Sequence, residues 1–180
     1  MKELPPLALV LSLCCFALQF DIAIAQTGKV APTLAKAGLA DAIAGGKKWK
    51  PDARLIQVEG RVTGDTGTTL GWRYGFYSPA AKSCAVIYVH AGQSHVTEAP
   101  GENCESAELK EFMDSDQALK LARSNGITAS QVTMAAHIAP TPQGERAMWT
   151  VMDEGGVKSS NVILDIDAQS GAVLNKTVQH

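Results

Sequence analysis

The chain repeats its own residue pattern at a nearly constant spacing, and this internal repeat constrains the fold more than any other feature. A shift of 77 residues places Trp72 on Trp149 and aligns apolar residues at several further positions. These pairs are Val86 with Ile163, Ile87 with Leu164, Val89 with Ile166 and Val96 with Val173. Upstream, a shift of 76 residues does the same for Ala42 with Ala118, Ile56 with Val132, Val58 with Met134 and Val62 with Ile138. Such self-similarity predicts one supersecondary unit that occurs twice, and the loop-like stretch 63–69 absorbs the extra residue.

Each copy is predicted to begin with a short helix. In the second copy, Asp114 is the expected helix cap, and Gln117 completes a capping-box pattern three residues later. The dipeptide Asn125-Gly126 is typical of a helix end. In the first copy, Thr33 is the expected cap and Gly45-Gly46 the expected end. The expected apolar sides are Leu34, Leu39 and Ile43 in the first helix, and Leu119 and Ala122 in the second.

Four strand-like runs follow each helix. In the first run, apolar and polar residues alternate with a period of two, which predicts a half-buried antiparallel strand. Its apolar members are Ile56, Val58 and Val62, and its polar members are Gln57, Glu59 and Arg61. The predicted core anchors of the next run are Trp72, Tyr74 and Phe76, echoed by Trp149 and Val151. The last two runs predict a hairpin, in which Asp167 accepts backbone N–H bonds and Gly171 tolerates a positive φ.

This hairpin carries the residues through which the chain resembles a known family. The run V-I-L-D-I-D-A-Q-S-G-A-V-L, preceded by A-M-W-T-V and by a helix with D-S-D-Q-A-L, is similar to the PepSY domain family. The first copy, with W-K-P-D-A-R-L-I-Q-V-E-G and V-I-Y-V-H-A-G-Q-S-H-V, resembles it more weakly, because His90 replaces the turn Asp and Ser94 the Gly. The resemblance implies an α+β fold of two cystatin-like, PepSY-like repeats, each a short helix packed on an antiparallel β-sheet. The repeats would span residues 26–105 and 106–180.

The same resemblance bears on function. PepSY-like proteins are often exported, and some are parts of peptidase propeptides, so the family implies a protein that binds a partner and modulates a peptidase. No inhibitory residue can be carried over, because the matching positions of this chain are turn and core residues. The alternative is an envelope protein that binds a small ligand or a metal in the groove between the repeats.

Residues 1–25 have the pattern of a cleavable signal peptide. Lys2 is followed by an apolar stretch at 7–20, and Ala23 and Ala25 form a small-x-small cleavage pattern before Gln26. Gln19 and Asp21 interrupt the apolar run, which argues against a stable membrane anchor. The sequence therefore predicts a secreted or periplasmic protein.

Cleavage changes the charge and the cysteine count. Removing Lys2, Glu3 and Asp21 leaves 15 basic and 16 acidic residues, and this near-neutral balance argues against a nucleic-acid or anionic-membrane partner. Of the four cysteines, Cys84 and Cys104 remain, and in an oxidising compartment they are predicted to form a disulfide. A ring of this size contributes roughly 3 kcal/mol in the loop-entropy model.

No pattern for catalysis or for a cofactor stands out. Gly-x-Ser-x-Gly and the P-loop do not occur, so we expect a non-enzymatic protein without a cofactor. Asp153, Asp165 and Asp167 lack the spacing of a calcium loop and are interpreted as structural. His90 and His95, with Glu98 and Glu102 nearby, do not have zinc-ligand spacing.

One surface is predicted to bind a partner. If Trp72, Tyr74 and Phe76 point toward the helix, then Arg73 and Tyr77 point to the other face, joined by Tyr88. Arg and Tyr suit protein interfaces. The competing interpretation is that this face packs against the other repeat or is an ordinary mixed surface.

The exported protein is predicted to begin at Gln26. Mass spectrometry of the chain recovered from outside the cytoplasm measures its N-terminus directly, and a product that retains residues 1–25 contradicts the cleavage.

Overall fold

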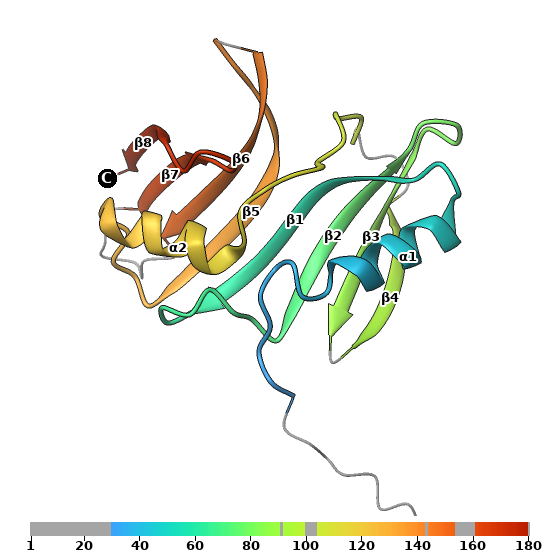
Figure 1. The fold of residues 1–180 in the computed structure, drawn as a ribbon, viewed down its shortest axis with the longest axis horizontal. Helices are drawn as coiled ribbons and strands as arrows, with labels where there is room; N and C mark the ends of the chain where they lie inside the picture. Colours follow the sequence, from blue (N-terminus) through green and yellow to red (C-terminus); the bar gives the residue numbers. More distant parts are fainter. Residues whose placement is uncertain (1–29, 91, 100–103, 143, 154–160, 180) are drawn as a thin grey trace, which may run out of the picture.

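The computed structural model describes residues 30–90, 92–99, 104–142, 144–153 and 161–179, and the predicted signal peptide lies outside them (Figure 1). Its elements are α1 (Leu39–Trp49), β1 (Arg54–Thr63), β2 (Gly71–Ser78), β3 (Ser83–His90), β4 (Gln93–Ala99), α2 (Ser115–Ser124), β5 (Gln131–Thr141), β6 (Gly144–Asp153), β7 (Asn161–Asp167) and β8 (Val173–Gln179). The strands form one open antiparallel sheet in the order β4-β3-β2-β1-β5-β6-β7-β8. The predicted α+β class is confirmed.

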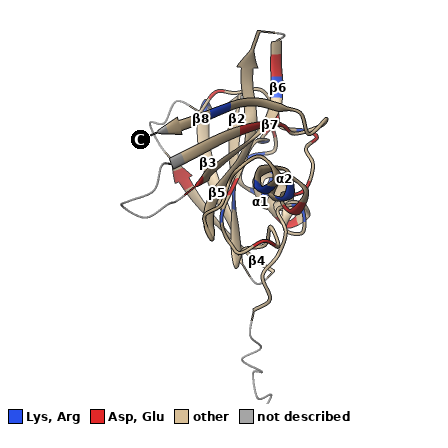
Figure 2. Ribbon diagram, turned by 90° about the vertical axis from the view of Figure 1, so that its left-hand side faces the viewer, with Lys and Arg blue, Asp and Glu red and all other residues tan. Residues whose placement is uncertain are grey.

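Both helices pack on the same side of this sheet. α1 contacts β1 to β4, and α2 contacts β6 and β7. Figure 2 shows the two helices end-on, on one side of the strands. The predicted anchors Trp72, Tyr74, Phe76, Trp149 and Val151 all point to this side and are at most 2% exposed, so their prediction is confirmed.

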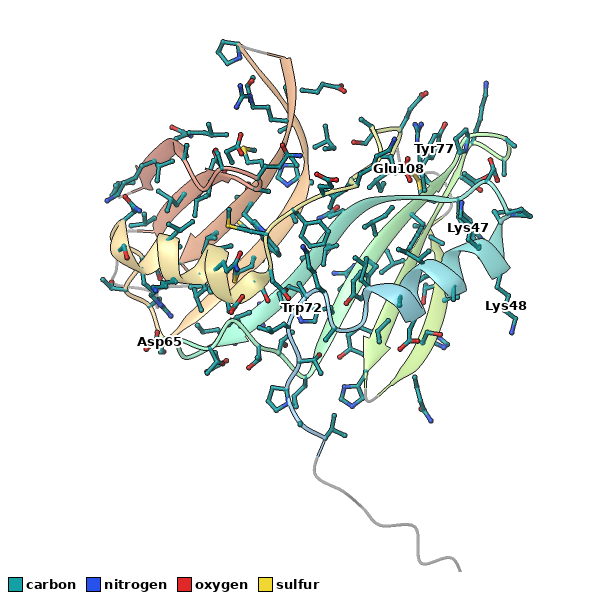
Figure 3. The ribbon with its side chains drawn as sticks, in the orientation of Figure 1. Lys47, Lys48, Asp65, Trp72, Tyr77 and Glu108 are labelled. Atoms are coloured by element: carbon teal, nitrogen blue, oxygen red, sulfur yellow. A yellow bond between two sulfur atoms is a disulfide. The ribbon has the colours of Figure 1, made fainter. Side chains whose placement is uncertain are left out.

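A single core lies between the sheet and the two helices. Trp72 lies centrally, between the helices (Figure 3), and its ring meets that of Trp149 edge to face at 6.3 Å. Phe112 contacts Trp149 in the same way at 6.0 Å. Such aromatic pairs stabilise a core by about 0.5–1.5 kcal/mol beyond the area they bury.

The segment before α1 is held to the sheet and to α2. Trp72 Nε1 donates to the carbonyl of Thr33 at 2.9 Å, and the Tyr74 hydroxyl to that of Ala35 at 2.8 Å. The Ala35 N–H in turn donates to Ser115 Oγ at 3.0 Å. The prediction that Thr33 caps this helix was wrong, because Thr33 instead forms a β-bridge with Thr69. The N-cap of α1 is Gly38, five residues after the predicted cap.

Gly45 and Gly46 do not end α1, which continues to Trp49. A Cβ at Gly46 would lie 2.6 Å from the Phe76 ring, so the glycine lets the helix approach the sheet closely. Ala42 and Gly46, one turn apart, are the buried positions of this helix. Ile43 is consequently 41% exposed, and its predicted place on the apolar side was wrong.

A β-bulge corrects the predicted face of Ile56. The pairing of β1 with β2 shifts by one residue between Leu55 and Gln57, and such a bulge sends the residues before it to the opposite face. Leu55 therefore joins the core beside Val58. Ile56 lies in a second cluster, with Tyr77 and Cys84.

The predicted end residues of α2 are confirmed, whereas the predicted capping box is replaced by a bond within the first turn. Asp114 is its N-cap and accepts the Ser115 N–H at 2.8 Å. Asn125 is the C-cap, and Gly126 has a φ of +101°. The Gln117 N–H bonds to the carboxylate of Asp116 at 2.8 Å.

Ser115→Ala is expected to destabilise the fold by about 1–3 kcal/mol. The fully buried hydroxyl accepts from Ala35 and donates to the carbonyl of Gly67 at 2.7 Å, so its loss leaves both backbone groups without that partner. The matched control is Ser124→Ala, which removes an exposed hydroxyl on the same helix and should cost less than about 0.5 kcal/mol. Urea unfolding of both variants measures the difference, and equal losses contradict the role of Ser115.

Candidate functional site

The open face is the side of the sheet that points away from α1 and α2. One row of Cα partners crosses it through all eight strands: His95, Tyr88, Arg73, Glu59, Ala135, Thr150, Asp165 and Asn175. Ile87 and Val89, the neighbours of Tyr88 in β3, are buried on the helix side, whereas Tyr88 is 41% exposed. The alternation predicted for β3 is therefore confirmed, and a mainly polar surface faces outward.

A hollow of about 340 Å³ lies on this face, where β1, β2, β3 and β5 meet. We call it the β2 hollow. The side chains that line it are Glu59, Arg61, Thr69, Arg73, Tyr88 and Thr133, and its backbone includes Gly60 and Gly71.

Tyr88 is held in place by its neighbours. Its ring lies across Gly71, where any Cβ would collide with the Tyr88 hydroxyl, so glycine at 71 is required for this arrangement. The imidazole of His90 stacks parallel to the ring at 6.0 Å, and His90 Nδ1 contacts the carbonyl of Leu70 at 2.6 Å. An aromatic side chain fixed in this way can contact a partner with little loss of conformational entropy.

Arg73 and Glu59 form the polar side of the β2 hollow. Arg73 Nη1 lies 3.7 Å from Glu59 Oε1, and the two side chains are 56% and 35% exposed. Gln57 Nε2 also approaches Glu59 Oε2, at 3.4 Å. An exposed ion pair of this length contributes at most about 1 kcal/mol, so another carboxylate can compete with Glu59 for the guanidinium.

Tyr77 is not available on the open face, and its predicted place in the binding surface needs correction. It points to that side of the sheet but is only 6% exposed, packed with Ile56 and Cys84. The guanidinium of Arg54 lies 5.2 Å from its ring centroid. Figure 3 shows Tyr77 toward the end of β2, at the same end of the sheet as Glu108.

The disulfide explains this burial. Cys84 in β3 is bonded to Cys104, with 6.3 Å between the Cα atoms, as predicted. The bond holds Cys104 against the cluster of Ile56 and Tyr77, which Ala99 also contacts. Arg73 and Tyr88 remain as direct Cα partners on the open face.

Sequence reasoning placed Glu59 and Arg61 on the polar side of β1 but did not include them in the binding surface. The alternation in β1 was the available signal for their face. That alternation does not predict which strands pair with β1. The pairing with β2 and β5 brings Glu59 beside Arg73 and Arg61 beside Thr133.

The aspartates considered for calcium each have protein partners. Asp167 accepts the N–H groups of Gln169 and Ser170 at 3.0 and 2.8 Å and pairs with Arg146 at 3.0 Å. Asp165 accepts from the Thr150 hydroxyl at 2.8 Å, and Asp153 from the Ala129 N–H at 3.2 Å. Among the described residues, no three His, Cys, Asp or Glu side chains are arranged to hold a metal ion.

Among the residues that the structure describes, further hollows lie outside the β2 hollow. One of about 430 Å³, at the seam between β1 and β5, is lined by residues that include Gln57, Glu105, His137 and Thr150. Another, of about 620 Å³, is lined by Glu108, Glu111, Glu145, Arg146 and Asp167 among others. No helix in the described ranges is long and apolar enough to cross a membrane.

Comparison with known proteins supports the fold alone. No family model and no curated protein matches the chain. Its fold is similar to the crystal structure of a protein from Clostridium difficile 630 described as a "putative lipoprotein". The TM-score is 0.54 at 12% identity, over 78% of this chain and 92% of that chain. The resemblance to the PepSY family stays a prediction.

Asp167 is predicted to make stability depend on pH. The Ser170 N–H, with Arg146 and the Gln169 N–H, lowers the pKa of Asp167 from 3.8 to about 2, although burial opposes the shift. A folded pKa below the unfolded one stabilises the protein above about pH 4, and this stabilisation is lost as the pH falls toward 2. Melting temperatures over this range should fall less steeply for Asp167→Asn than for the wild type. Glu105→Gln, an exposed carboxylate, is the control, and identical slopes for wild type and Asp167→Asn contradict the prediction.

Proposed function

We propose that this chain is an exported, non-enzymatic protein of two PepSY-like units that binds a protein partner, with a peptidase as the partner class. The observation that carries the binding proposal is the β2 hollow, where Arg73 and Tyr88 lie side by side on a face covered by neither helix. Tyr and Arg are enriched among residues that dominate binding energy in interfaces. The peptidase as partner rests on the family resemblance.

The proposal of two units is supported by matching contacts as well as by the sequence repeat. One helix precedes β1–β4 and the other precedes β5–β8, and β1 and β5 are neighbours in the sheet. Trp72 Nε1 donates to the Thr33 carbonyl before α1 at 2.9 Å. Trp149 Nε1 likewise donates to the Met113 carbonyl before α2, also at 2.9 Å. The aligned tryptophans thus make the same kind of bond to the segment that leads into each helix.

Export is supported by three observations. The N-terminal residues have the pattern of a signal peptide cleaved after Ala25. The Cys84–Cys104 disulfide is of a kind that persists in oxidising compartments. The structurally similar protein of Clostridium difficile 630 is described as a "putative lipoprotein". A secreted or periplasmic location agrees with all three. The proposal that no membrane anchor remains after cleavage rests on the interrupted apolar stretch at 7–20 alone.

A second candidate is a small-ligand protein, favoured by the hollow at the seam between β1 and β5. Its lining offers Gln57, His137 and Thr150 as polar contacts. In this case a protein-free extract of small molecules should raise the melting temperature of the wild type, and His137→Ala should abolish the rise.

Site-specific cross-linking tests the partner proposal. A photo-reactive p-benzoylphenylalanine in place of Tyr88 is expected to capture a peptidase in the compartment where the chain resides. The same residue in place of the exposed Lys120, on α2, is the control and should not capture it. With the purified partner, Arg73→Ala combined with Tyr88→Ala should weaken binding at least about tenfold. Identical products from both positions, or unchanged affinity of the double variant, would overturn the proposal.

A further inference from the structure

The charged side chains of the open face differ in balance from the rest of the chain. On β1 and β2 this face carries Arg54, Arg61 and Arg73 against a single carboxylate, Glu59. The whole chain, by contrast, has a formal net charge of −2. Arg61 and Arg73 are among the side chains that line the β2 hollow, whereas Arg54 lies outside its lining, 5.2 Å from the ring centroid of Tyr77.

These two arginines approach the hollow from adjacent strands. Glu59 in β1 is the Cα partner of Arg73, and Arg61 is the next residue of β1 on the same face. Diagonal neighbours on adjacent strands lie within reach of long side chains. Tyr88, the Cα partner of Arg73 on its other side, adds an exposed ring to the same hollow.

This combination favours carboxylates as ligands. A guanidinium has five N–H donors and binds a carboxylate in a two-point geometry. Arg73 lies 3.7 Å from Glu59, in a long and largely exposed ion pair that an incoming carboxylate can displace. An apolar or aromatic side chain next to that carboxylate can lie against the Tyr88 ring, which Gly71 and His90 hold in place.

We propose that the β2 hollow binds an acidic segment of the partner protein, with carboxylates on Arg61 and Arg73 and an aromatic neighbour on Tyr88. This inference rests on the proposed function and gives the chemistry of the partner. Two arginines with a carboxylate between them are too few for a nucleic-acid backbone, whose binding depends on many cationic contacts. Because the interaction is ionic and exposed, raising the salt concentration should weaken it.

Fluorescence anisotropy of labelled peptides tests the inference with the full exported chain. The probe is an octapeptide that alternates Glu and Phe, and the matched peptide has Gln in place of Glu. The wild type should bind the acidic peptide at least about tenfold more tightly than the Gln peptide. Arg61→Gln with Arg73→Gln should remove this preference. Lys48→Gln with Lys120→Gln, which removes the same charge from exposed positions on α1 and α2, should keep it.

A variant that is expected to bind more tightly is also needed, because misfolding can lower the affinity but not raise it. Glu59→Gln removes the carboxylate that competes for Arg73, so it should bind the acidic peptide about two- to threefold more tightly than the wild type. Unchanged or weaker binding by Glu59→Gln, or an equal loss in the two double variants, overturns the inference. Tighter binding of an oligothymidylate than of the acidic peptide, lost in the arginine variant, overturns it in favour of a nucleic acid.

The peptide-binding test and the Tyr88 cross-linking test can fail independently of each other. If Tyr88 cross-links to a peptidase but the acidic peptide does not bind, the proposed function stands and this inference fails. If the acidic peptide binds through the arginines while no peptidase is captured, a different partner with an acidic segment is indicated.

Discussion

The edge-to-face contact of Trp72 and Trp149 joins the parts of the core that lie under α1 and α2. It depends on Gly60, because a Cβ there would lie 2.6 Å from the indole of Trp72. Each indole N–H also holds a backbone carbonyl ahead of a helix, at Thr33 and Met113. The position of both helices on one side of the sheet therefore follows from two aromatic side chains and the glycine beneath one of them.

The opposite side of the same sheet also has an aromatic ring packed over a glycine, but there the ring is partly exposed. Tyr88 lies over Gly71 as Trp72 lies over Gly60, but on the face that neither helix covers. In the core, the aromatic ring fills space between layers. On the open face, the ring is left 41% exposed beside Arg73. Because both helices are committed to one side, a surface of this kind is available for a partner.

The alternation of apolar and polar residues, together with local residue types, predicted the regular parts of the fold. The buried faces of β2 and β3, the caps of α2 and the turn at Asp167 followed from local residue patterns. Ile56 did not, because a bulge changes the face of a strand without changing its composition. Gly45 and Gly46 suit a helix end and a close helix–sheet contact equally well, and only the position of Phe76 decides between them.

The surface that we propose for binding was predictable only in part, for a related reason. Arg73 and Tyr88 could be assigned a face from their own strands, whereas the burial of Tyr77 depends on its cluster with Cys84 and Cys104. The association of Arg61 with Arg73 depends on the register between β1 and β2. Both features depend on contacts between segments that are far apart in the chain. Local residue patterns do not predict such contacts.

The Cys84–Cys104 bond also has a mechanical consequence. The two cysteines are 20 residues apart, and β4, an edge strand of the sheet, lies within the loop they close. A tensile force applied to the two ends of the chain passes through the sulfur–sulfur bond and bypasses that loop. Stretching therefore loads the chain before Cys84 and after Cys104. β4 and the part of β3 that follows Cys84 carry none of the tension along their backbones and cannot be extended until the bond is cut.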